Sequence, residues 1–70
     1  MSSNNINSLK QFAENGDKIA MFSLAICYEN GKGTEKDLEK AFYWYQKAAK
    51  KDDIDAILKL SAIILEKEQK

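Results

Sequence analysis

Apolar residues recur along this chain at intervals of three and four, the spacing that gathers them on one side of an α-helix. In the first such segment, predicted over 4–14, the pattern is carried by Ile6, Leu9 and Phe12. Asn15 and Gly16 follow it, a typical helix ending. Similar segments predict three more helices, over 17–30, over 35–51 and from 52–55 onward. The pattern therefore indicates an all-α chain of about four antiparallel helices.

The clearest turn lies at residues 29–34. Gly31 is expected to end the second helix in the left-handed conformation, which costs little without a side chain. Thr34 followed by Asp37 fits a cap at the start of the third helix, in which the hydroxyl and the carboxylate accept hydrogen bonds from free backbone amides. We therefore expect the third helix to begin at about residue 35.

Two of the predicted helices are apolar on two sides, and such a helix is normally covered on two sides. The helix over 17–30 has neighbours before and after it and is expected to form an interior layer. The fourth helix has no helix after it in this sequence, yet it carries a second apolar stripe at Ile54, Leu58 and Leu65. We expect this stripe to be covered by a further repeat, a partner protein or a second copy of the chain.

A shift of 36 residues aligns the chain with itself. Asp17, Ala20 and Leu24 then fall on identical residues, namely Asp53, Ala56 and Leu60. The run from Ala20 to Ala49 closely resembles the Sel1-like repeat, a relative of the tetratricopeptide repeats. The positions that match its packing and turn pattern are Ala20, Leu24, Tyr28, Gly31, Gly33, Asp37, Ala41, Trp44, Tyr45, Ala48 and Ala49. Asp52 departs from the pattern, because that unit typically ends in glycine.

The resemblance implies an α/α solenoid in which helix pairs stack into a right-handed superhelix whose surfaces bind proteins. On this interpretation residues 1–70 form a single domain. Residues 1–15 are the tail of a preceding repeat, 16–51 are one full repeat, and 52–70 are the first helix of a following repeat or a cap. The residues carried over from the family are structural, so the resemblance implies neither catalysis nor a cofactor.

Charge and composition narrow the choice of partners. Eleven basic residues balance eleven acidic ones, and a nucleic-acid partner is not expected without a basic excess. No stretch reaches the roughly 18 apolar residues of a transmembrane helix, and residues 1–13 lack the pattern of a signal peptide. With Cys27 as the one cysteine, no internal disulfide can form. A reducing, cytoplasmic setting is the default expectation.

Candidate catalytic, metal and cofactor sites are all weak. Ser23, Ser61 and Cys27 have no histidine to activate them. The glycine-containing turn places Tyr28 and Lys32 where a calcium loop requires oxygen ligands, so no metal is expected. Aromatic rings at positions 42–45 point in different directions around a helix and cannot form a stacking platform. Tyr43 alone falls on the polar side, where it is a candidate protein contact.

Two hypotheses remain. The first is a non-catalytic adaptor or scaffold module that binds a protein partner or further repeats through Tyr43 or the Ile54, Leu58 and Leu65 stripe. The second is a small structural protein that forms a homodimer through its last helix, because a two-fold contact would bury that stripe symmetrically.

Overall fold

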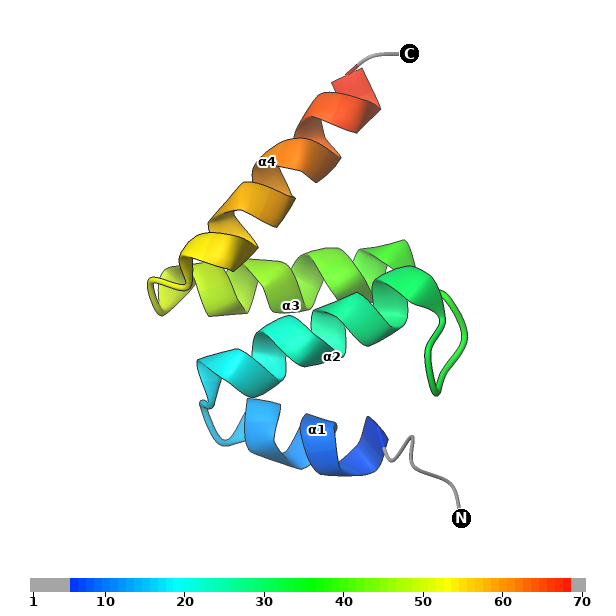
Figure 1. The fold of residues 1–70 in the computed structure, drawn as a ribbon, viewed down its shortest axis with the longest axis vertical. Coiled ribbons are helices and arrows are strands. Elements are labelled where there is room, and N and C mark those ends of the chain that lie inside the picture. Colours follow the sequence, from blue (N-terminus) through cyan, green and yellow to red (C-terminus); the bar gives the residue numbers. More distant parts are fainter. Residues whose placement is uncertain (1–5, 69–70) are drawn as a thin grey trace.

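The computed structural model of this chain describes the backbone of residues 6–68 and the side chains of residues 6–66. That part of the chain forms four helices and no strand: α1 (Ile6–Glu14), α2 (Lys18–Asn30), α3 (Leu38–Lys50) and α4 (Ile54–Glu68). Helix α2 lies between α1 and α3, and α4 crosses α3 and leans away from the other three (Figure 1). The predicted all-α chain of four helices is confirmed, and the superhelix of a longer solenoid stays a prediction.

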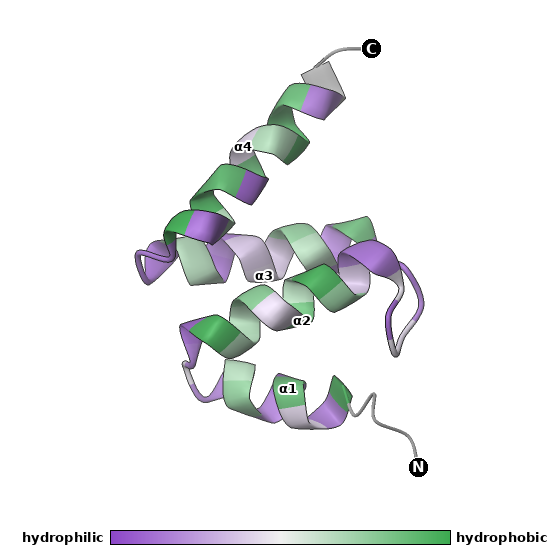
Figure 2. Cartoon of the chain, viewed as in Figure 1, coloured by the Kyte–Doolittle hydropathy of each residue, from purple (hydrophilic) through white to green (hydrophobic). Residues whose placement is uncertain are grey.

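The core combines small residues with a few large ones. Ala41 and Ala48 on α3 are fully buried and let neighbouring helices approach closely. Tyr45 lies between them in sequence and, with Leu24 of α2, is the largest fully buried side chain. Figure 2 shows apolar residues along much of α2, which two helices cover, and along much of α4, which chiefly contacts α3. The remaining buried residues are Ala13, Ala20, Met21, Ala25, Tyr28 and Ala56.

Helix α3 begins later than the sequence indicates. It starts at Leu38, and the cap is Asp37, whose Oδ1 accepts a hydrogen bond from the amide of Lys40 at 3.2 Å. The expectation of a helix from residue 35 capped by Thr34 is wrong. The reason is tertiary: the amide of Asp37 donates to the carbonyl oxygen of Tyr28 at 2.8 Å, which anchors the loop to the end of α2.

The same hydrogen bonds occur at two places 36 residues apart. Asp17 caps α2 through an Oδ1 that accepts from the amide of Ala20, and Asp53 accepts from the amide of Ala56 in the same way, both at 3.2 Å. The backbone amide of each aspartate also donates to the carbonyl oxygen five residues earlier. Asp17 donates to Phe12, and Asp53 donates to Ala48. The internal repeat is therefore present in the backbone geometry as well as in the residue pattern.

Asp52 occupies a backbone conformation that suits glycine. Its φ is +68°, and it is the one residue other than glycine with a positive φ in the described chain. The residue 36 positions earlier is Gly16, which has φ +100°. A side chain in this left-handed region costs free energy, although aspartate tolerates it better than most residues.

Some apolar residues are more exposed than helical periodicity suggests. Phe12, which carries the apolar pattern of α1, is 57% exposed, and Ile19, in the first turn of α2, is 69% exposed. On α4, Ile57 and Ile64 are exposed to nearly the same extent, 44% and 45%, although α4 leans away from α3 only toward its C-terminal end (Figure 1). The exposed side of α4 therefore extends along the helix.

We predict that Asp52→Gly stabilises the fold by about 0.5–1 kcal/mol, because it relieves the left-handed strain of a residue with a side chain. Urea unfolding followed by circular dichroism measures the change. Asp53→Ala is the contrasting control, since it removes the side-chain cap of α4 and should destabilise by about 1 kcal/mol. A loss of stability in Asp52→Gly would contradict this prediction. It would show that the Asp52 side chain stabilises the fold by more than the left-handed backbone conformation costs.

Candidate functional site

Most of the large exposed apolar side chains among the described residues lie on α4. We call this set the α4 stripe, and it consists of Ile54, Ile57, Leu58, Ile64 and Leu65. Helical spacing places the candidate contacts Ile54, Leu58 and Leu65 within about 40° of one another around the helix axis. All three are exposed, and Leu58 is exposed by 62%. The structure thus brings these three candidates together, whereas Tyr43 lies on α3.

The repeat explains part of this apolar surface. At a shift of 36 residues α4 corresponds to α2, and Met21 and Tyr28 of α2 are only 3% and 4% exposed. Their counterparts on α4 are Ile57 and Ile64, which are 44% and 45% exposed. Helix α2 is covered by α1 and α3, whereas α4 has chiefly α3. Ile57 and Ile64 therefore occupy positions that are covered on α2 and uncovered on α4.

Tyr43 is half-exposed and already has neighbours on its own helix. Its ring stands edge-on to that of Trp44, with centroids 5.1 Å apart. The Nζ of Lys47 lies 5.4 Å from the Tyr43 ring centroid, a cation–π arrangement. Trp44 itself is half-buried and packs against the core. A partner that contacts Tyr43 would meet a ring already held in place.

The other sequence-predicted positions lie in the interior, at its edge or in the turns. Ala20, Leu24, Tyr28, Ala41, Tyr45 and Ala48 are buried, and Ala49 is partly buried against the core. Gly31 and Gly33 have positive φ in the loop before α3, where Gly31 ends α2. A Cβ added to Gly31 would lie 3.4 Å from the amide nitrogen of Lys36. This loop therefore combines a left-handed turn with close backbone packing.

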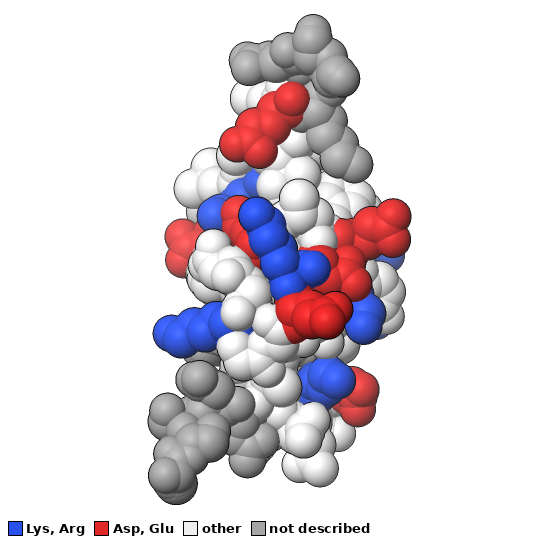
Figure 3. All heavy atoms as spheres, turned by 90° about the vertical axis from the view of Figure 1, so that its right-hand side faces the viewer, with Lys and Arg blue, Asp and Glu red and all other residues white. Residues whose placement is uncertain are grey.

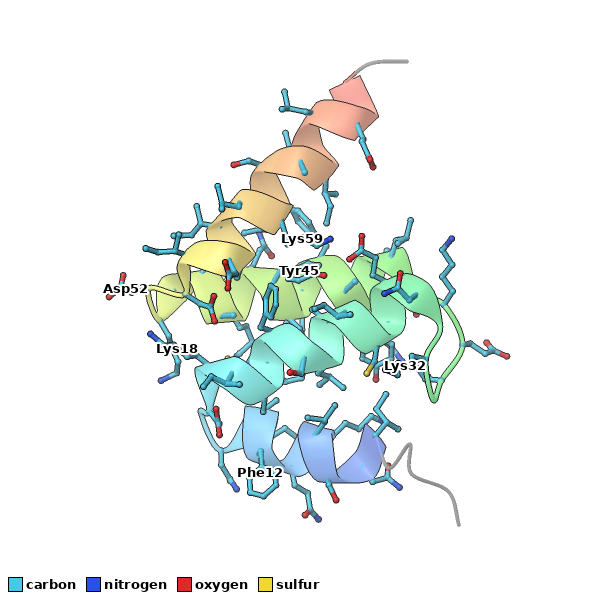
Figure 4. The ribbon with its side chains drawn as sticks, in the orientation of Figure 1. Phe12, Lys18, Lys32, Tyr45, Asp52 and Lys59 are labelled. Carbon is cyan, nitrogen blue, oxygen red and sulfur yellow. The ribbon has the colours of Figure 1, made fainter. Side chains whose placement is uncertain are left out.

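A polar cluster joins three helices beside the core, and nothing in the sequence pattern indicated it. The hydroxyl of Tyr45 on α3 donates to Oε1 of Glu29 on α2 at 2.6 Å. The Nζ of Lys59 on α4 lies 3.2 Å from the same oxygen and 5.9 Å from the centroid of the Tyr45 ring. Figure 4 shows Tyr45 and Lys59 meeting where α4 crosses α3. We call Glu29, Tyr45 and Lys59 the three-helix cluster.

The cluster changes how its members ionise. Burial alone would raise the pKa of Glu29, but the hydrogen bonds from Tyr45 and Lys59, with the positive charge of Lys59, lower it below its ordinary value. Burial raises the pKa of Tyr45, and the adjacent Glu29 carboxylate raises it further. Near neutral pH the cluster is a neutral phenol and a carboxylate–ammonium pair, which is an arrangement suited to holding helices together.

Other chemistry is sparse in the described part of the chain. Residues 6–66 contain no group of three or more His, Cys, Asp or Glu side chains that could hold a metal ion. Cys27 is a free thiol and half-buried. No helix in the described range has both the length and the apolar character to cross a membrane.

The Sel1 repeat family model matches residues 18–53, which are 36 of the 70 residues. The chain therefore belongs to the Sel1 repeat family, whose members are generally protein–protein interaction modules and typically not catalytic. The match spans α2, the loop and α3, and it ends at the Asp53 cap. The division into 1–15, 16–51 and 52–70 stays a prediction.

The chain matches a small part of two much longer relatives. The chain is 49% identical over 41 residues to chitin synthase regulator SKT5 of Saccharomyces cerevisiae, covering 59% of this chain and 6% of that protein. It is also 49% identical over 37 residues to DAP3-binding cell death enhancer 1 of Rattus norvegicus, covering 53% and 7%. No solved structure matches the chain significantly. The likeness thus concerns one repeat and not the whole of either protein.

We predict that Tyr45→Phe destabilises the fold by about 1–2 kcal/mol, because Glu29 loses a charge-assisted hydrogen bond in a partly buried position. Tyr43→Phe is the matched control, since its ring lies on the half-exposed side of α3, and it should change the free energy of unfolding by less than about 0.5 kcal/mol. Denaturant unfolding of both variants makes the comparison. Equal effects would mean that the Tyr45 hydroxyl contributes nothing specific.

The lowered pKa of Glu29 predicts an acid-dependent loss of stability. In the folded state the pKa of Glu29 lies below its ordinary value of 4.5. The contribution of the charged carboxylate to the free energy of unfolding is therefore fully present above about pH 4.5. It is lost as the pH falls through the pKa of the folded state. Glu29→Gln should be less stable at neutral pH and should flatten this part of the profile. Unfolding curves measured between about pH 3 and 7 test it; an unchanged profile in the variant would contradict it.

Proposed function

We propose that this chain is an adaptor or scaffold module that binds a protein partner through the α4 stripe and has no catalytic activity. The observation that carries the proposal is the contrast between α2 and α4. Met21 and Tyr28 are buried on α2, whereas their repeat equivalents Ile57 and Ile64 are exposed on α4 beside the exposed Ile54, Leu58 and Leu65. Exposed apolar residues gathered on one helix face are typical of protein interaction sites.

Two further findings support this proposal. Members of the Sel1 repeat family are generally interaction modules. One relative is named as a regulator of an enzyme and another as a binding protein, and both names fit surfaces that act on other proteins. The single Cys27, which has no partner for an internal disulfide, supports a reducing, cytoplasmic setting.

A second copy of the chain is the alternative occupant of the α4 stripe. A two-fold axis beside α4 would place Leu58 of one copy against the α4 stripe of the other, so that a single patch serves both copies. No charged side chain interrupts the line of Ile54, Leu58 and Leu65, which is the observation that keeps this alternative open. A complex with a partner protein and a dimer of this chain differ in mass.

Site-specific photo-crosslinking in cells separates the two occupants. A benzophenone amino acid replaces Leu58, and the control carries it at Ile19, which is also exposed but lies on α2. The adaptor proposal predicts a discrete adduct with a different protein at position 58 and none at position 19. An adduct of twice the chain mass would favour the homodimer. Equal labelling at both positions would overturn the proposed surface.

We further predict that Leu58→Glu remains helical and monomeric and loses the crosslinked partner. Because Leu58 is exposed by 62%, its replacement should change the free energy of unfolding by less than about 0.5 kcal/mol. Sedimentation equilibrium and circular dichroism on the same samples check the mass and the helicity, with Ile19→Glu as the control. Conversion of a wild-type dimer to a monomer by Leu58→Glu would instead establish self-association.

A further inference from the structure

A small cleft lies where α4 leans away from α3, on a different part of the molecule from the Ile54 and Leu58 end of the α4 stripe. It has a volume of about 220 Å³ and is lined by Leu38, Phe42 and Ile63 together with Glu29, Glu39 and Glu66. These residues come from the end of α2, the first turns of α3 and the C-terminal half of α4. The cleft thus combines an apolar lining with three carboxylates.

The carboxylates leave a negative charge that the described side chains do not neutralise. Glu29 is paired with Lys59 in the three-helix cluster. The carboxylates of Glu39 and Glu66 have no hydrogen bond or ion pair within residues 6–66. Lys40, the next residue after Glu39, is engaged elsewhere, with its Nζ 5.4 Å from the Tyr28 ring centroid. Two carboxylates without a partner among the side chains of residues 6–66 therefore border an apolar cleft.

The surrounding surface does not continue this negative charge. On the face turned to the reader in Figure 3, where α2 ends and α3 begins, acidic and basic side chains lie interleaved. The chain as a whole has a formal net charge of zero. Attraction for a cationic group is therefore local to the cleft and is not a general property of the molecule.

The size of the cleft favours one side chain over a small-molecule ligand. Pockets for cofactors and drug-sized molecules typically measure about 300–1,000 Å³, and this cleft has about 220 Å³. An aromatic or large aliphatic side chain could pack on Leu38 and Phe42, and both of these residues are incompletely buried. Lysine or arginine residues on either side of it would then lie near Glu39 and Glu66.

We propose that this cleft binds a short basic peptide segment of a partner protein, with one large apolar side chain inserted between α3 and α4 and flanking lysine or arginine residues beside Glu39 and Glu66. The inference rests on the proposed interaction function, to which it adds a second surface and the chemistry of its ligand. A partner could contact this cleft and the α4 stripe together, so that two weak contacts reinforce each other.

The test uses the whole chain labelled with ¹⁵N and a capped pentapeptide probe, Lys-Lys-Phe-Lys-Lys. Its control peptides are Lys-Lys-Gly-Lys-Lys, which keeps the charge, and Glu-Glu-Phe-Glu-Glu, which keeps the ring. We expect amide shifts confined to residues 29, 38–42 and 63–66, with an affinity about tenfold above either control at low salt. Scattered shifts, or equal binding of the glycine peptide, would overturn the proposal.

A matched pair of variants separates the cleft from general electrostatics. The double variant Glu39→Gln with Glu66→Gln should weaken the probe about tenfold, which is about 1.4 kcal/mol. The control double variant Glu14→Gln with Glu35→Gln removes the same charge from exposed positions outside the cleft and should have little effect. Equal weakening by both pairs would overturn the cleft. So would shifts of the cleft amides on concentrating the chain without peptide, which would identify a second copy as the occupant.

These outcomes are independent of those for the α4 stripe. Absence of probe binding up to about 1 mM would remove the cleft as a basic-peptide site. The adaptor proposal would stand if the crosslink at position 58 still formed. The reverse result, with probe binding but no crosslink, would retain the cleft and remove the α4 stripe.

Discussion

Tyr45 is a fully buried side chain that carries a hydroxyl group, and a buried hydroxyl needs a hydrogen-bond partner. Glu29 of α2 supplies the partner, and Lys59 of α4 balances the charge that Glu29 brings with it. One residue of α3 thus determines where the end of α2 and the middle of α4 must lie. Alanines at positions 41 and 48 leave the room that allows this approach.

The two ends of α4 consequently have different environments. Its first turns are held by the Asp53 cap and by the burial of Ala56 against α3. Past Lys59, Leu60 and Ile63 still pack against the core, and the cleft lies beside Ile63 where α4 leans away from the first turns of α3 (Figure 1). The way α4 crosses α3 therefore opens the acid-bordered cleft and leaves the α4 stripe exposed.

The two surfaces suit different ligands. The α4 stripe offers broad apolar contact, which gives affinity with little selectivity by itself. The cleft is small and charged, so it can select a partner by the sequence of a short segment. Both surfaces lie on α4 or beside it, so a substitution that moves α4, such as one in the three-helix cluster, is expected to affect both. In the function that we propose, the last described helix therefore contributes to both binding surfaces.

Local information along the chain was sufficient for the helices and for the repeat. Periodic apolar residues, the caps at Asp17 and Asp53 and the left-handed Gly31 all act within a few residues, so the sequence by itself determined four helices related by a 36-residue shift. It also predicted the exposed residues Ile54, Leu58 and Leu65. Only the tertiary structure decided the start of α3, where the hydrogen bond from the Asp37 amide to the Tyr28 carbonyl accompanies a cap at Asp37 in place of the expected Thr34. The same is true of the three-helix cluster, in which Glu29 bonds to residues 16 and 30 positions away, and of the cleft, which is lined by residues of three helices. Both form only through helix packing.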